Sequence, residues 1–221
     1  MRKIIFHYNL NKDIDNYINS IYRFKWLKHE RKDIDVWTKR FLFPEELKVI
    51  QEAENEIAAR KILKDILTKI TQRNRYEFLI MQQSLEKSWY RKERRFFELT
   101  EQFYRKPIFF PQTTAYFTTL PICPYSLKEC WFMVSYRFSL EEQVRTICHE
   151  IMHFMFLYYY QDTALKEAFT VFLNTDFREI VSIPDRGYPQ EKELRNFLFT
   201  KRKTTTSFPE LLKEGIQFLK T

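Results

Sequence analysis

Apolar residues recur at helical spacing along most of the first half of the chain. Ile14, Tyr17, Ile18 and Ile21 are one such set, and residues spaced three or four apart lie on one helix face. A short apolar run at Lys3–Tyr8 predicts a strand. We expect three helices, with the last two forming a hairpin: from Asn11 or Asp13 to about His29, from Pro44 to about Thr71, and from Arg75 to about Arg105.

The pattern changes after Pro107. Two aromatic and β-branched runs bounded by prolines, Ile108–Leu120 and Trp131–Phe138, predict strands. Ser139 and Glu142 then form a capping-box pattern that begins a helix running to about Tyr160. Further helices are predicted at about Ala164–Phe177, capped by Asp162 or Thr163, at Gln190–Phe199 and at Phe208–Lys220. Strands grouped together among helices predict an α+β fold.

Composition and charge divide the chain at the same point. Of its 221 residues, 1–106 contain 24 Lys and Arg against 16 Asp and Glu, whereas 107–221 contain 13 of each. We therefore expect a helix-rich basic part, 1–106, and a second part, 107–221, that contains the other predicted strands and the C-terminal helices. Packing of the two parts as one compact unit is left open. The basic part could attract nucleic acid, but solvated helix faces are the favoured explanation of the charge.

Several classes of protein are excluded or disfavoured by composition. The two glycines, Gly187 and Gly215, cannot supply a Rossmann or P-loop phosphate-binding motif. No apolar run approaches the roughly 20 residues of a membrane span, so no membrane partner is expected. The three cysteines form no CxxC pair, which fits a reducing compartment. A cytoplasmic protein is the resulting expectation.

The predicted helix after Ser139 contains the sequence His149-Glu150-Ile151-Met152-His153, an HExxH motif. Residues four apart on a helix are separated by about 40° around its axis, so the two imidazoles can bind one metal ion from the same face. Catalytic Zn²⁺ takes three protein ligands and leaves one position open. Glu150, about 100° away from His149, is then placed to act as a general base.

This motif resembles that of the zincin metallopeptidases. The metzincin extension is absent, because Phe156 and Tyr159 occupy the positions of its Gly and His. The resemblance therefore implies a gluzincin-like arrangement, in which a Glu on the following helix is the third ligand. Glu167 is the candidate, and Asp162 and Asp176 are weaker ones.

The resemblance also implies supporting residues. Gluzincins of the thermolysin type have an Asp four residues after the Glu ligand, but this position is Val171 here, so a carboxylate that supports a His ligand must come from elsewhere. Asn174 could supply a hydrogen bond behind the ligands, although a surface amide is an equal alternative. Tyr188 is the candidate for stabilising an oxyanion, against the alternative of an aromatic side chain that anchors a turn.

The function implied is zinc-dependent peptide-bond hydrolysis by a zincin-like core, that is, a small mixed sheet with an active-site helix and a glutamate helix. Trp131–Phe138 is placed like the zincin edge strand that binds an extended peptide or protein substrate. Two alternatives remain open. One is a binding protein on a zincin scaffold without peptidase activity. The other is a nucleic-acid-associated regulator in which 107–221 is a protease.

Overall fold

The computed structural model describes residues 3–20, 49–50, 52–107, 111–205 and 207–220. The chain divides into two compact units. Within the described residues, unit 1 contains residue 3, 85–112 and 139–220, and unit 2 contains 4–84 and 113–138. Each unit therefore contains residues from before and after position 106, whereas composition predicted a single division of the chain at that point.

Parallel strand pairing in the sheet of unit 2 explains this interleaving. Strand β1 (Ile4–Tyr8) pairs in parallel with β2 (Thr113–Thr118). Two segments that are separated by residues 9–112 in the sequence therefore share one sheet. Strand β4 (Trp131–Ser135) pairs in parallel with the other side of β2. In the described residues the strands form a small mixed sheet of order β1-β2-β4-β3. The α+β class expected from the sequence is confirmed at this level.

Strand β4 is not the edge strand that the sequence predicted. The short strand β3 (Tyr125–Ser126) pairs antiparallel with Trp131 and Phe132, the first two residues of β4. The next amide, that of Met133, donates to the carbonyl of Pro124 at 2.9 Å. Because these backbone groups are already paired, this part of β4 cannot receive an added peptide strand.

Two helices of unit 2 begin at different residues from those expected. Helix α1 (Leu10–Ile18) is capped by Asn9, whose side chain accepts from two backbone amides. Asp13 is not a cap but is fully buried, where it accepts from Thr118 at the end of β2 and from Thr119, the next residue. The predicted end of this helix at His29 lies outside the described residues.

Helix α5 (Glu56–Arg73) begins where Asn55 caps it, and residues 52–55 are not helical. A single helix from Pro44 to Thr71 is therefore wrong, and Pro44 itself lies outside the described residues. Helices α1 and α5 pack through a hydrophobic cluster. The fully buried members of this cluster include Ile18, Ile50, Ala59, Leu63 and Leu67.

The predicted hairpin between the next two helices is also wrong. Helix α6 (Arg75–Tyr104) follows α5 after Asn74 alone. The amide of Asn74 donates to the carbonyl of Ile70, and the amide of Phe78 donates to that of Asn74. Helical hydrogen bonds therefore continue on both sides of this residue, whereas a reversal needs a loop of at least two residues. Asn74 is the only residue between the two helices, so no Gly or Pro is present there to form such a loop.

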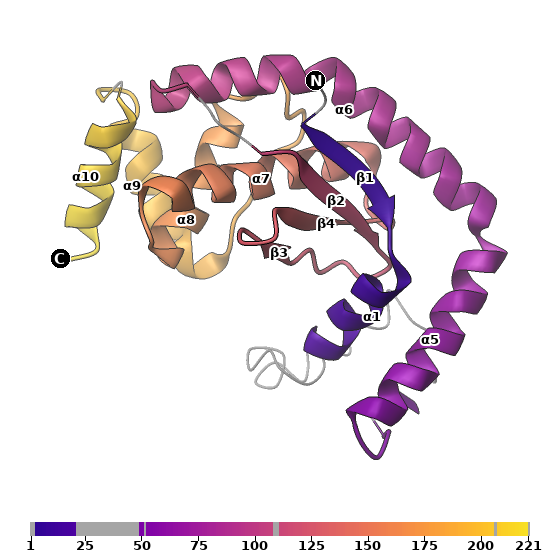
Figure 1. The fold of residues 1–221 in the computed structure, drawn as a ribbon. Helices are drawn as coiled ribbons and strands as arrows, with labels where there is room; N and C mark the ends of the chain where they lie inside the picture. The colour runs from indigo at the N-terminus through magenta and orange to yellow at the C-terminus, as the bar shows by residue number, and fades with distance from the viewer. Residues whose placement is uncertain (1–2, 21–48, 51, 108–110, 206, 221) are drawn as a thin grey trace. The chain divides into compact units, whose positions relative to one another are not determined.

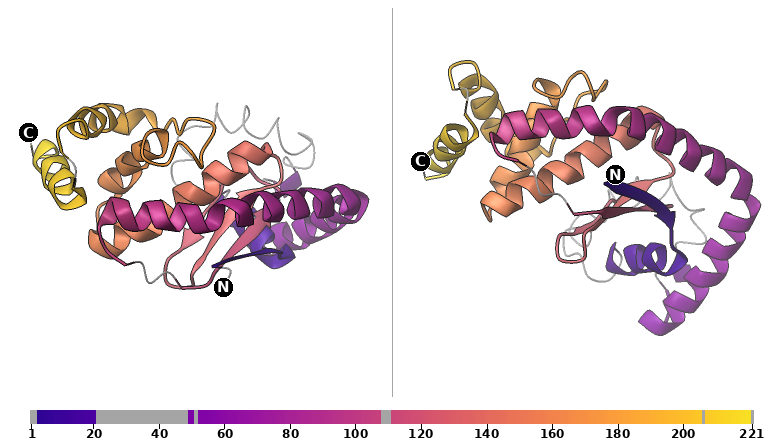
Figure 2. Two further views of the ribbon diagram at one scale, coloured as in Figure 1. Left: turned by 90° about the horizontal axis from the view of Figure 1, so that it is seen from above. Right: turned by 45° about the horizontal axis from the view of Figure 1, so that its top comes forward.

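Unit 1 consists of helices around an aromatic core. Helix α7 (Leu140–Tyr159) is followed by α8 (Thr163–Phe169), the 3₁₀ turns η2 (Thr170–Asn174) and η3 (Pro189–Glu191), α9 (Lys192–Lys201) and α10 (Phe208–Phe218). In Figure 2, α9 and α10 lie side by side. Phe208 of α10 packs against Phe156 and Phe169 of α7 and α8. None of the helices in the described parts of the chain has the length and apolarity needed to cross a membrane.

Candidate metal centre

Helix α7, which contains the HExxH motif, has a well-defined start. The side chain of Ser139 accepts from the amide of Glu142, and the amide of Ser139 donates to the Glu142 carboxylate at 2.8 Å. This is the predicted capping box, and it is confirmed. From this start, His149 and His153 are separated by about one turn, and their ring centroids are 4.2 Å apart.

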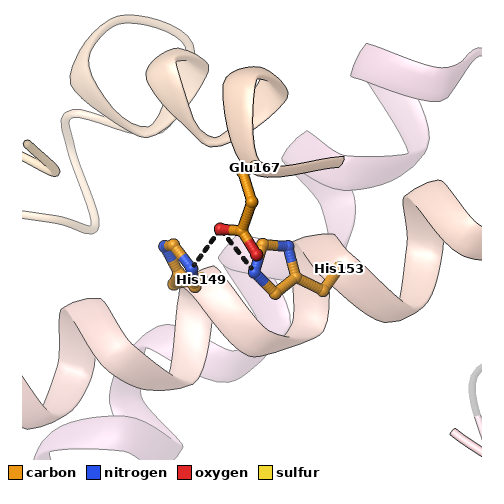
Figure 3. A group of neighbouring side chains, drawn as sticks. All are labelled: His149, His153 and Glu167. Atoms are coloured by element: carbon orange, nitrogen blue, oxygen red, sulfur yellow. Dashed lines mark ion pairs between the residues drawn. The ribbon is translucent and has the colours of Figure 1, made fainter. Parts of the chain in front are cut away.

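The second helix, α8, brings Glu167 to the two histidines. Asp162 caps α8 by accepting from the amide of Leu165 at 2.8 Å, so only a short turn separates α8 from α7. Oε2 of Glu167 lies 3.6 Å from Nε2 of His149 and 3.3 Å from Nε2 of His153 (Figure 3). Within the described residues, these three are the one group whose ligand atoms converge in this way, all within 4.8 Å of one another.

These separations fit the geometry of donors that share one cation. Two ligands about 2.1 Å from a tetrahedral Zn²⁺ are roughly 3.4 Å apart, which matches both distances. Oε2 of Glu167 is buried and has no hydrogen-bond partner among the described residues. A buried carboxylate oxygen without such a partner is costly unless a positive charge compensates it. The donor set of two imidazoles and one carboxylate is one that zinc uses in catalytic sites.

Lys166 forms an ion pair with the other oxygen of the Glu167 carboxylate. Its ammonium group lies 2.8 Å from Oε1 of Glu167, and its side chain is only 7% exposed. Because Oε1 is engaged by this ion pair, Oε2 is the oxygen left facing the histidines. Lys166 was not singled out in the sequence, where it is one of many lysines.

A carboxylate supports His149 from behind. Nδ1 of His149 lies 2.8 Å from Oδ2 of Asp185. With Asp185 ionised, Nδ1 is the donor, and a neutral imidazole then presents the lone pair of Nε2 toward Glu167. Asp185 thus supplies the support for which the sequence offered no candidate at Val171. No periodic pattern surrounds Asp185, so nothing in the sequence distinguishes it from neighbouring acids.

Asn174 supports the site indirectly, through hydrogen bonds to Asp185. Its side-chain oxygen accepts from the amide of Asp185 at 2.7 Å, and its side-chain nitrogen donates to the carbonyl of Asp185 at 2.8 Å. These two bonds fix the backbone of Asp185. Asn174 therefore lies behind Asp185, which in turn contacts the ring of His149.

The four titratable groups of this cluster perturb one another strongly. Burial opposes ionisation of Asp185, but the hydrogen bond with His149 and the charge of Arg195 hold its pKa below the usual range. Desolvation lowers the pKa of His149, yet the bond and charge of Asp185 outweigh it and raise the pKa to about 10. Burial and the charge of His149 lower the pKa of His153 to about 3. Despite burial, the two imidazoles and Lys166 keep the pKa of Glu167 below its usual range.

Glu150 is buried in α7, with 6% of its surface exposed. Its Oε2 has no hydrogen-bond partner among the described residues. Burial raises the pKa of Glu150 to about 7. The positive charge of His149 reduces this shift, and the negative charge of Glu167 increases it. A carboxyl group of this kind can exchange a proton near neutral pH, which is what general acid–base chemistry requires.

The remaining sequence candidates lie elsewhere. Asp162 is the cap of α8, and Asp176 is bound by Arg202, with 3.1 Å between its Oδ1 and Nε. Neither belongs to the cluster. Tyr188 precedes η3 and is 52% exposed. Its role in stabilising an oxyanion stays a prediction.

No protein-family model, curated protein or solved structure matches this chain.

Proposed function

We propose that this protein is a zinc-dependent metallopeptidase with a gluzincin-like set of ligands, His149, His153 and Glu167. The observation that supports this most strongly is the convergence of these three donors, at 3.3 and 3.6 Å, around a buried carboxylate oxygen. The zincin-like core is part of the same proposal. Its support is local: the helix with the HExxH motif is followed, after a capped turn, by the helix with the glutamate.

The protein's own groups have distinct tasks in this proposal. When bound, zinc would supply Lewis acidity that favours attack on a peptide carbonyl. Glu150 takes a proton from the attacking water and delivers it to the leaving amine. Asp185 keeps the ring of His149 in one orientation, and Lys166 does the same for the carboxylate of Glu167.

The proposed peptidase differs from a zinc-binding scaffold in its need for Glu150. Glu150→Gln keeps the size of the side chain and removes its basicity. We expect the variant to retain wild-type zinc content and thermal stability but to lose about 10²–10⁴-fold in cleavage rate. The assay is hydrolysis of a peptide library followed by mass spectrometry, with and without a chelator.

Glu141→Gln is the matched control, because Glu141 is an exposed acid in the first turn of the same helix. Cleavage that is chelator-sensitive in the wild type and in Glu141→Gln, but absent from Glu150→Gln, would support the peptidase. Undiminished cleavage by Glu150→Gln would contradict the role of this carboxylate.

A further inference from the structure

The guanidinium group of Arg195, on α9, joins the two sides of the candidate metal centre. One terminal nitrogen donates to the carbonyl of Glu167 at 3.1 Å and to the hydroxyl of Thr170 at 2.6 Å. The other donates to the carbonyl and to Oδ1 of Asp185, at 2.8 and 2.9 Å. Arg195 is 5% exposed, so these bonds form in a nearly dry interior.

These partners are the supports of two different ligands. Glu167 is itself a ligand in the proposed function, and Asp185 orients the ligand His149. The first lies on α8, whereas the second lies in a segment without helix or strand between η2 and η3. A planar guanidinium has its donors in a fixed geometry. One rigid group therefore sets where the backbone of Glu167 lies relative to the carboxylate of Asp185.

The absence of a side chain at Gly187 leaves room for this guanidinium. Its φ of +62° lies in the left-handed region, and a Cβ built there would lie 2.6 Å from three atoms of the Arg195 side chain. A larger residue would have to displace the guanidinium or the segment that contains Asp185. The segment and Arg195 thus fit each other closely at the point where Asp185 is held.

We propose that Arg195 is a positioning residue of the metal centre, which sets the spacing between Glu167 and the imidazole of His149 and so determines zinc affinity. This inference rests on the proposed function, because it takes these residues as zinc ligands. Arg195 contacts no ligand atom that would face the ion. It acts through the carbonyl of Glu167 and the carboxylate of Asp185.

Zinc affinity tests this proposal without any activity assay. Arg195→Lys keeps the charge but lacks the planar pair of nitrogens, and Thr170→Val removes one of the partners while keeping the size. Zinc chloride is titrated in competition with a chromogenic chelator at fixed pH. We expect about 10–100-fold weaker binding for Arg195→Lys, as is typical when a residue behind the ligands is lost. Thr170→Val should weaken binding by a smaller factor.

Arg202→Lys is the matched control. Arg202 follows α9 in the same unit, binds Asp176 and the carbonyl of Thr205, and has no contact with the cluster. It should bind zinc as the wild type does, even where its melting temperature falls. The visible spectrum of the Co²⁺-loaded proteins gives a second readout, since it reports ligand geometry. The spectrum of Arg195→Lys should change and that of Arg202→Lys should not.

The outcomes separate the two levels of the proposal. Zinc binding by the wild type, together with equal affinity and equal Co²⁺ spectra in Arg195→Lys and Thr170→Val, would overturn the positioning role of Arg195. A wild-type protein that binds no zinc would overturn the proposed function itself. If Arg195→Lys does not fold, Thr170→Val alone decides, since unchanged affinity in that variant contradicts the proposal.

Discussion

At His149, one carboxylate decides which ring nitrogen is available to a metal ion. Asp185 engages Nδ1 at 2.8 Å, which leaves Nε2 as the ring nitrogen that faces Glu167. The sequence predicts the two histidines and Glu167 from helical spacing and from resemblance, because those depend on local geometry. It cannot predict Asp185, whose contact spans 36 positions and depends on a segment without regular structure.

The choice among the acids near the motif gives a prediction at this scale. Glu167→Ala removes the carboxylate that lies between the two imidazoles, and zinc binding should weaken by at least 100-fold. Asp176→Ala is the control, because it breaks a pair with Arg202 that lies outside the cluster. It should leave the zinc dissociation constant unchanged. Chelator competition measures both, and equal affinities in the two variants would argue against Glu167 as a ligand.

The helix that contains Glu167 shows where tertiary contacts override a sequence pattern. The periodicity predicts one helix over about Ala164–Phe177, yet α8 ends at Phe169 and a 3₁₀ turn follows. At this point the carbonyl of Glu167 accepts from the hydroxyl of Thr170 at 2.7 Å and from Arg195 at 3.1 Å. Groups outside the helical ladder thus satisfy that carbonyl, and one of them comes from 28 residues away in the sequence.

Helix α7, by contrast, is predictable because its start is encoded locally. Ser139→Ala removes one bond of the capping box and should lower the free energy of unfolding by about 1 kcal/mol. Zinc affinity should not change, because His149 lies more than two turns further along the helix. Urea denaturation measures the loss, and Ser139→Thr, which can still cap, should stay close to the wild type. Equal stability of Ser139→Ala and the wild type would contradict the role of the cap.

At the scale of the whole molecule, every residue of the candidate centre belongs to unit 1. The sequence identified β1, β2, β4 and the α+β class, because those strands are rich in aromatic and β-branched residues, but it did not identify the two-residue strand β3. It did not identify the two units, because parallel pairing of β1 with β2 joins residues more than 100 positions apart. It also predicted a hairpin where Asn74 allows the chain to continue almost without interruption.

The proposed metal centre is tested most directly by the zinc content of the purified protein, determined by elemental analysis. Three donors around one point predict about one zinc per wild-type chain. His149→Ala and His153→Ala should each lose most of this zinc, and His7→Ala should keep it, since His7 belongs to the sheet of unit 2. Wild-type protein without zinc after zinc loading, or equal zinc in the wild type and in both motif variants, would contradict the metal centre.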